Sequence, residues 1–402
     1  MDTLRKAAVF FMMMLVFALP TDGAAEIAGM SLVKIAGLMS FGLAAVLLMM
    51  GNGIHAVPGF HSAVLLYVAW VMLSYTWSEM PVPYETSQAV SSEQALKSNL
   101  YILMIALLLF QLAATRHDLN LLYVALVLGS FWLVYLMVKD YQIGGNTVRH
   151  EIKQFDANEV SVKLAMVIPL AIYLLTLCQQ WWWRVLGLVY IPAAGFTILI
   201  TGSRTGAVIM VLGLVGFVPT ILRSGLIGKT ASVLVVMVAL IGIANVIPQK
   251  TIERIFSTGK EISSGTLNER SVIWANAYEE WEESPIIGHG LGSFRRIINP
   301  YNVDYTAHNS FVAVTAEQGI IGTVLYLAVI SVAFAAAWRL RGDERLLLSL
   351  MLLIVVIGQM SLTLQDRMYI WFAYALAVLG AYINNNPVKT AYSSTNKMAV
   401  NT

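Results

Sequence analysis

Apolar segments of membrane-crossing length recur twelve times along this chain of 402 residues. A helix needs about 20 consecutive apolar residues to cross the hydrocarbon core of a bilayer. Hydrophobic residues make up 58% of the chain and charged residues only 12%, which is about half the charged share of a soluble domain. The pattern predicts an all-α, polytopic membrane protein with spans near residues 7–20, 29–50, 61–78, 97–114, 119–138, 160–178, 183–201, 205–222, 230–247, 309–337, 346–363 and 368–383.

The distribution of lysine and arginine predicts which side of the membrane each loop occupies. Twelve spans put both termini on one side, and the cations concentrate in the loops of that side, which the positive-inside rule assigns to the cytoplasm. We therefore expect one transmembrane domain over residues 1–383, with a large helical loop on the outer face at 248–307 and a disordered cytoplasmic tail at 384–402. The cations are Arg5, Lys6, Arg116, Arg184, Arg223, Lys229, Arg339, Arg341, Arg345, Lys389 and Lys397.

Two segments admit a second interpretation. Residues 5–25 could be a cleavable signal peptide instead of an uncleaved first helix, and the topology of the remaining chain would be unchanged. The loop at 139–159 departs from the positive-inside rule, because it places Lys139, Arg149 and Lys153 outside. Either its four carboxylates balance these cations, or the cations bind an anion.

Several classes of function are excluded by motifs that the chain lacks. A net charge of +2 without a basic, aromatic-rich stripe argues against nucleic-acid binding. The single cysteine, Cys178, allows neither a disulfide nor a thiolate metal site, and His289 and His308 have no carboxylate at zinc-ligand spacing. The glycine-rich segment 288–293 lacks the Lys-Ser/Thr of a P-loop, and there is no Gly-x-Ser-x-Gly motif. We expect neither a metal nor a cofactor.

Three ionisable features recur on the predicted outer face, and the first is the turn T-G-S-R-T-G at residues 201–206. A helix that begins here would have Ser203 or Thr205 as its N-cap. Its free amides and its dipole would form an anion site that Arg204 reinforces. In the alternative, Arg204 only anchors the helix at the membrane interface.

The second feature is Arg270, in the segment N-E-R-S-V-I-W-A-N-A-Y-E-E-W at 268–281, which is typical of an amphipathic helix. Arg270 falls in the first turn, where a cation opposes the helix dipole, so its position suggests a functional reason. In the alternative, Arg270 forms an ordinary salt bridge with Glu269 or Glu253.

The third feature is the pair His308 and Asn309 at the start of the apolar segment 309–337. The positive end of a helix dipole disfavours an imidazolium, and a neutral imidazole can accept a proton. Asparagine is a good N-cap but histidine is not a preferred one, so capping alone explains Asn309 better than His308.

Two outer arginines and a neutral imidazole together indicate a transfer reaction. Because nucleotide sugars are absent from the outer face, the natural electrophile there is a lipid-linked diphosphate sugar. Guanidinium groups bind the departing diphosphate bidentately and need no metal. The imidazole of His308 would act as general base on the hydroxyl of an acceptor sugar, which gives inversion by direct displacement.

The same motifs carry a resemblance to a known family. The segments T-G-S-R-T-G, N-E-R-S-V-I-W-A-N-A-Y with S-P-I-I-G-H-G-L-G-S-F, and H-N-S-F-V-A-V-T-A-E-Q-G-I-I-G resemble, in this order, the O-antigen ligase/polymerase superfamily of bacterial envelope enzymes. Its members are twelve-span proteins with a large periplasmic loop before the last three helices. The resemblance therefore implies a multi-pass protein of the bacterial inner membrane with a periplasmic active site.

The resemblance implies a metal-independent, inverting glycosyltransferase that moves a glycan from undecaprenyl diphosphate to a sugar hydroxyl. Arg204 and Arg270 match the two diphosphate-binding arginines of the family, and His308 matches its catalytic base. Glu317 matches the family signature too, and we expect it to have a structural role within its helix. Further contacts with substrate are expected at Arg149, Asn309, Arg295 and Arg296.

Ligases and polymerases of this superfamily differ in the acceptor to which they transfer the glycan. We expect a ligase, whose acceptor is the lipid A core in lipopolysaccharide biosynthesis, and whose surroundings are membrane lipids. The compact loop at 248–307 favours the alternative, an O-antigen or exopolysaccharide polymerase that extends lipid-linked repeats. A transporter or flippase belongs to another class, and it would need ionisable groups near the bilayer midplane. Lys34 and Lys163 come nearest to that position, and each could snorkel to the interface.

Overall fold

The structure is a computed structural model that describes residues 2–21, 26–27, 30–50, 55–78, 92–144, 155–226, 230, 270–298 and 306–386. It is all-α, as predicted, apart from two short antiparallel strands, β1 (Glu26–Ile27) and β2 (Met30–Ser31). Short 3-10 turns extend α1 and α9. The helices are α1 (Asp2–Ala18), α2 (Leu32–Met49), α3 (Pro58–Ser74), α4 (Ser92–Leu112), α5 (Arg116–Gly144), α6 (Ala157–Ala165), α7 (Ile168–Leu177), α8 (Trp181–Ile200), α9 (Arg204–Leu214), α10 (Val218–Arg223), α14 (Arg270–Glu283), α15 (Phe294–Ile298), α16 (Ser310–Arg339), α17 (Gly342–Ser361) and α18 (Met368–Asn385).

Eight helical segments of the described chain are long and apolar enough to cross a membrane, which confirms a polytopic membrane protein. One of them, Ala157–Leu177, consists of α6 and α7 in succession. Helices α3 and α18 and the apolar part of α4 (Leu96–Leu112) occupy three further predicted spans. The predicted span at 230–247 lies outside the described residues, apart from Thr230, as do 248–269 and 299–305 of the predicted loop and 387–402 of the predicted tail.

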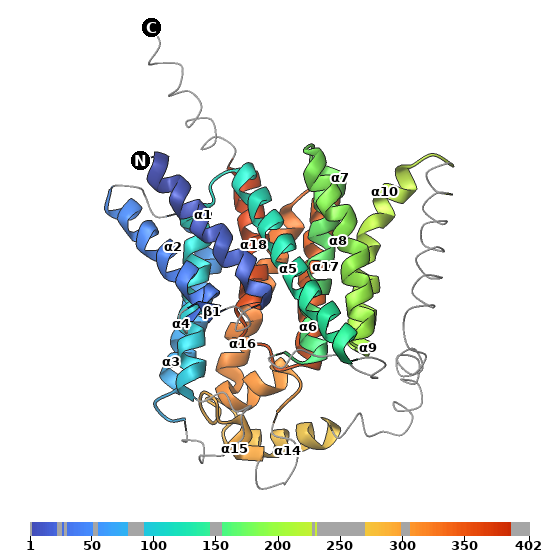
Figure 1. Cartoon of the computed structure of the whole chain (residues 1–402). Helices are drawn as coiled ribbons and strands as arrows, with labels where there is room; N and C mark the ends of the chain where they lie inside the picture. Colours follow the sequence, from blue (N-terminus) through green and yellow to red (C-terminus); the bar gives the residue numbers. More distant parts are fainter. Residues whose placement is uncertain are drawn as a thin grey trace.

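The helices run between two opposite sides of the bundle (Figure 1). Helix α1 begins and α18 ends on one side, which we call the amino-terminal side. Helices α14 and α15 lie on the other, which we call the loop side. Helices α9 and α18 both begin on the loop side. The amino-terminal side carries the ion pairs Arg5–Asp118, Arg116–Glu344 and Arg223–Asp343.

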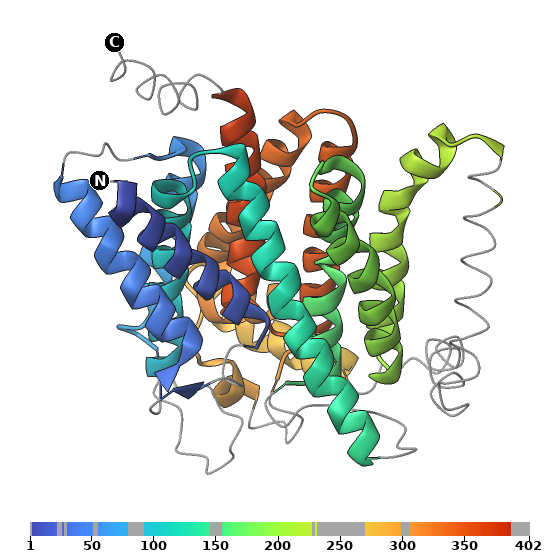
Figure 2. The same ribbon diagram turned by 45° about the horizontal axis from the view of Figure 1, so that its top comes forward.

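Helix α18 lies at the centre of the bundle, where α4, α5, α16 and α17 pack around it (Figure 2). Helix α18 is apolar on every side and is buried almost throughout, as expected of a helix that other helices surround. Trp371 of α18 stacks on Tyr67 of α3, with ring centroids 5.3 Å apart, and lies 5.9 Å from the ring of Tyr326 of α16. The loop before α18 is held against the start of α16 by hydrogen bonds of Ser310 with Leu362 and Leu364.

Candidate functional site

Helix α9 begins as the sequence predicts, with Ser203 as its N-cap. The hydroxyl of Ser203 accepts a hydrogen bond from the amide of Gly206 at 2.9 Å, so Arg204 is the first residue of the helix. The same hydroxyl donates to Oδ1 of Asn158 in α6 at 2.7 Å. The hydroxyl oxygens of Thr201 and Ser161 lie 2.9 Å apart and form a hydrogen bond. These bonds fix the start of α9, and with it the backbone of Arg204, against the start of α6.

A buried ion-pair cluster in α6 adjoins this junction. Nζ of Lys163 lies 3.1 Å from Oε1 of Glu159, and Lys163 is 2% exposed. The ammonium also lies 3.5 Å from the ring centroid of Phe155 and 5.1 Å from that of Tyr369. The prediction that Lys163 snorkels to the interface is therefore wrong, because a carboxylate one turn away and two aromatic rings satisfy the ammonium inside the protein. Glu159 belongs to this helix, although the sequence suggested that it balances cations in the preceding loop.

Arg367 connects the cluster to the loop before α18. Its Nη2 lies 3.4 Å from Oε2 of Glu159, and its side chain is 47% exposed. Sequence reasoning missed this contact and the role of Glu159. The spacing of Glu159 and Lys163, four residues apart in an apolar segment, was the signal that could have predicted a buried pair.

Arg270, which the sequence places in the first turn of its helix, is the first described residue of α14. The indole of Trp274 donates a hydrogen bond to the carbonyl of Ala307 at 2.8 Å. Ile273 and Ala277 pack with Ala307 and the start of α16 in one buried apolar cluster. Arg270 and Trp274 are four residues apart and share one helix face, so the start of α14 lies beside the residue that precedes His308.

His308 has a strained backbone. Its φ is 46°, and it is the only residue other than glycine with a positive φ in the described part of the chain. Oγ1 of Thr306 lies 2.9 Å from Nε2 of the imidazole, within hydrogen-bond distance. Asn309 is the N-cap of α16, as predicted, and its Oδ1 accepts from the amides of Phe311 and Val312. An unfavourable conformation that neighbouring bonds maintain is typical of functional sites.

Helix α16 is broken at Gly319, and the turn at 285–290 fills the break. Gly319 has φ 62° and ψ −167°, so the helical hydrogen bonds are interrupted there. The amides of His289 and Gly290 donate to the carbonyls of Ala316 and Glu317, and the amide of Ile320 donates to Pro285. The carboxylate of Glu317 accepts from the amide of Phe294 at 3.1 Å. Two of the three sequence motifs thus interlock through backbone hydrogen bonds.

A continuous set of contacts connects Arg204 with His308. Ser203 binds Asn158, the next residue Glu159 pairs with Arg367, and the loop that contains Arg367 binds α16. In this last step, the hydroxyl of Ser310 donates to Leu362 and accepts from Leu364, at 2.9 and 2.8 Å. The structure therefore brings the helix starts that carry Arg204, Arg270 and His308 to one side of the bundle (Figure 1).

The other predicted contact residues are Arg149, Arg295 and Arg296. Arg149 lies outside the described residues. Arg295 and Arg296 are half-buried in α15, which packs against α14 through Phe294, Ile297 and Ile298. Their roles, like those of Arg204, Arg270, His308 and Asn309, stay predictions.

Asp366 adds a titratable group beside Arg367. Partial burial raises the pKa of the Asp366 carboxyl from 3.8 to about 6, although Arg367 and a hydrogen bond from Asn99 act in the opposite direction. A carboxyl whose pKa is raised by folding contributes stability below its unfolded pKa, and that contribution is lost as the pH rises through the folded pKa.

We therefore expect the melting temperature of the wild-type protein, relative to that of Asp366→Asn, to rise as the pH falls from 7 to 4. The gain in stability should not exceed about 3 kcal/mol, because the carboxyl is only partly buried. Thermal unfolding in detergent across this range measures the difference. If the melting temperatures of the wild type and Asp366→Asn change with pH in the same way, the pKa of Asp366 is not raised.

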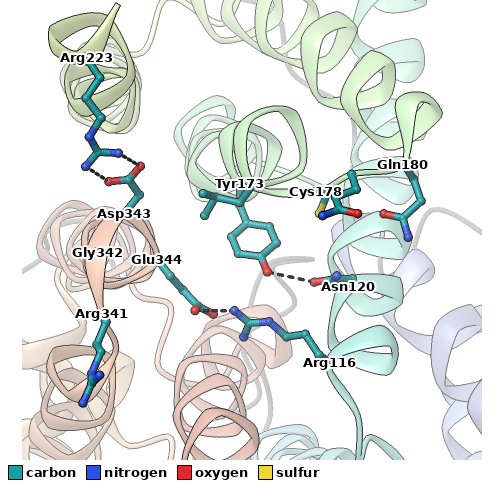
Figure 3. Close-up of a pocket in the computed structure, with 12 residues that line it drawn as sticks. Arg116, Asn120, Tyr173, Cys178, Gln180, Arg223, Arg341, Gly342, Asp343 and Glu344 are labelled. Carbon is teal, nitrogen blue, oxygen red and sulfur yellow. Dashed lines mark hydrogen bonds and ion pairs between the residues drawn. The ribbon is translucent and has the colours of Figure 1, made fainter.

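A cavity of about 540 Å³ lies on the amino-terminal side, away from these helix starts (Figure 3). Its wall holds the ion pairs Arg116–Glu344 and Arg223–Asp343 and a hydrogen bond from Tyr173 to Asn120. None of the predicted catalytic or substrate-contact residues lines it. The wall also contains Cys178, where burial raises the pKa of the thiol to about 11, so this cavity offers no activated nucleophile.

Comparisons with known proteins agree with the resemblance seen in the motifs. Residues 193–327 match the O-antigen ligase family. An O-antigen ligase of Pseudomonas aeruginosa is 33% identical over 81 residues, which is 20% of this chain and 20% of that protein. The chain thus aligns with about a fifth of the length of this curated relative. The family match encloses Arg204, Arg270 and His308, together with the turn and the break in α16 that interlock.

Proposed function

We propose that this chain, which belongs to the O-antigen ligase-like superfamily, is a membrane glycosyltransferase that moves a glycan from undecaprenyl diphosphate to a sugar hydroxyl. The proposed acceptor is the lipid A core, and the proposed site is the loop side, on the periplasmic face of the bacterial inner membrane. The observation that carries the proposal is the gathering of the Arg204, Arg270 and His308 backbones on one side, within the residues that match the family. Both chain termini would then be cytoplasmic.

The proposed reaction is a direct displacement. The acceptor hydroxyl loses its proton to the imidazole of His308 and attacks the anomeric carbon of the donor sugar. The bond from that carbon to the diphosphate oxygen breaks, and undecaprenyl diphosphate leaves with the electron pair. Arg204 and Arg270 stabilise the developing negative charge bidentately, with support from the dipole at the start of α9.

The transporter alternative receives less support from the fold. A transporter places ionisable groups where the substrate can reach them near the midplane. Lys163 is instead paired with Glu159 and covered by aromatic rings, so it is not available to a passing anion. The polymerase alternative uses the same chemistry with a different acceptor, and experiment must separate it from the ligase.

Reconstitution with defined acceptors tests the proposed function. The purified protein in lipid vesicles should transfer glycan from a polyprenyl-diphosphate donor to lipid A core, and a chelator should leave the rate unchanged. If the protein elongates a second lipid-linked repeat and does not modify lipid A core, it is a polymerase and the assignment as a ligase is wrong. If glycan is transferred to neither acceptor but the donor crosses the vesicle membrane, the protein is a flippase and the proposed enzymatic function is wrong.

Thr306 should be a positioning residue for the imidazole of His308. We expect Thr306→Val, which keeps the shape but removes the hydroxyl, to lower kcat by about 10- to 100-fold with little change in KM. Thr306→Ser keeps the hydroxyl and should restore most of the rate. Vesicle assays across a pH range measure both effects. Equal losses in the two variants would mean that the methyl group matters and the hydrogen bond does not.

A further inference from the structure

The cavity on the amino-terminal side has the dimensions and the location of a lipid headgroup site. Its volume of about 540 Å³ lies within the range of small-ligand pockets. The end of α7, the start of α17 and the turn 178–180 contribute to its wall. Beside it, Trp181 and Trp182 are 75% and 45% exposed, and exposed tryptophans mark the interface between membrane and water.

Two buried polar atoms in the cavity wall lack a partner within the described structure. Glu344 is buried, and its carboxylate pairs with Nη2 of Arg116 through Oε2 at 2.5 Å. Oε1 of Glu344 and Nη1 of Arg116 have no hydrogen-bond partner among the described residues. An unmatched carboxylate oxygen requires a donor, and an unmatched guanidinium nitrogen requires an acceptor, so a ligand that satisfies both must carry the two functions close together.

The remaining charges limit the ligand further. Arg223 binds Asp343 through two hydrogen bonds of 2.6 and 2.8 Å, so this pair is already satisfied. Arg341 is exposed and forms no ion pair with another described residue. The cavity thus has a buried carboxylate in its wall and an additional cation near its opening, an arrangement that suits a ligand with a cationic end and an anionic group.

An apolar surface continues from the cavity along the neighbouring helices. Five exposed residues on α9, α10 and the 3-10 turn between them follow one another at intervals of three and four, which places them on one face that ends next to Arg223. A lipid whose headgroup enters the cavity could lay an acyl chain along this face. The residues are Val208, Val211, Val215, Val218 and Leu222.

We propose that this cavity binds an aminoethyl phosphodiester, the headgroup of phosphatidylethanolamine. The primary ammonium donates to Oε1 of Glu344, and the phosphate accepts from Nη1 of Arg116 and from Arg341. Charge-assisted hydrogen bonds of this kind are roughly twice as strong as neutral ones. The site is independent of the proposed glycan transfer, because it lies on the opposite side of the bundle and shares no residue with the catalytic set.

Lipid competition on the full-length protein tests the proposal. Delipidated protein in detergent is offered equimolar phosphatidylethanolamine, phosphatidylcholine and phosphatidylglycerol with the same acyl chains, and the retained lipid is quantified by native mass spectrometry. We expect at least 5-fold preference for phosphatidylethanolamine over phosphatidylcholine, whose methylated ammonium has no N–H to donate. Equal retention of these two lipids, or stronger retention of phosphatidylglycerol, would overturn the assignment, and this measurement needs no variant.

Variants then locate the bound lipid. Glu344→Gln should reduce the preference to less than 2-fold, whereas Glu283→Gln, an exposed carboxylate of α14 on the loop side, should leave it unchanged. An undiminished preference in a folded Glu344→Gln protein would exclude this cavity as the site. Free phosphoethanolamine, added as a competitor, should displace the lipid only weakly; displacement at equal concentration would identify a soluble ligand and contradict a lipid site.

Discussion

Replacement of His308 by glycine is expected to abolish glycan transfer without lowering the stability of the protein. Loss of a general base costs about 10²- to 10⁴-fold in rate. The backbone of His308 has a φ of 46°, a conformation that costs a residue with a side chain about 1–2 kcal/mol and costs glycine almost nothing. Release of this strain should keep the melting temperature of His308→Gly at or above that of the wild type. Transfer in vesicles and thermal unfolding in detergent measure the two effects separately.

His308→Asn is the matched control for this substitution. Asparagine tolerates a positive φ and forms hydrogen bonds, but its amide cannot accept a proton from a sugar hydroxyl near neutral pH. We expect a folded protein with as little transfer as His308→Gly. Activity within about threefold of wild type in either variant would refute the role of His308 as base. A marked fall in melting temperature in both would indicate instead that the imidazole mainly holds the turn together.

Gly319→Ala is expected to prevent folding of the loop side, at a cost of roughly 3 kcal/mol or more. Gly319 has a φ of 62°, and a Cβ atom there would overlap the backbone carbonyl of Ile286. Since backbone, and not a flexible side chain, stands in the way, the turn at 285–290 would have to leave the break in α16. The yield of monodisperse protein and its melting temperature measure this effect.

Gly59→Ala provides the control for a glycine whose surroundings are open. A Cβ atom at Gly59, in the first turn of α3, would have no heavy atom within 4 Å. We expect this variant to match the wild type in yield and melting temperature. If Gly319→Ala behaves in the same way as Gly59→Ala, then the interlocked turn and helix break are not needed for folding.

The helices and their caps could be predicted from the sequence because their causes are local. An apolar segment of sufficient length must form a helix in lipid, where its backbone groups can bond only within the segment. The N-cap residues Ser203 and Asn309 bond to amides two or three residues further along, so the same local sequence specifies both helix starts. The predicted orientation followed from counting cations in loops, which also needs no knowledge of packing.

Contacts between distant segments required the tertiary structure. The burial of Lys163 depends on Glu159 in its own helix and on aromatic rings that other segments supply, so hydropathy alone suggested snorkelling. The break at Gly319 exists because the turn at 285–290 replaces the missing helical hydrogen bonds. The sequence by itself thus determined the helices and the residue types of the candidate site. Only packing decided which helix starts lie on the same side of the bundle, because hydrogen bonds and ion pairs between distant segments have no sequence periodicity.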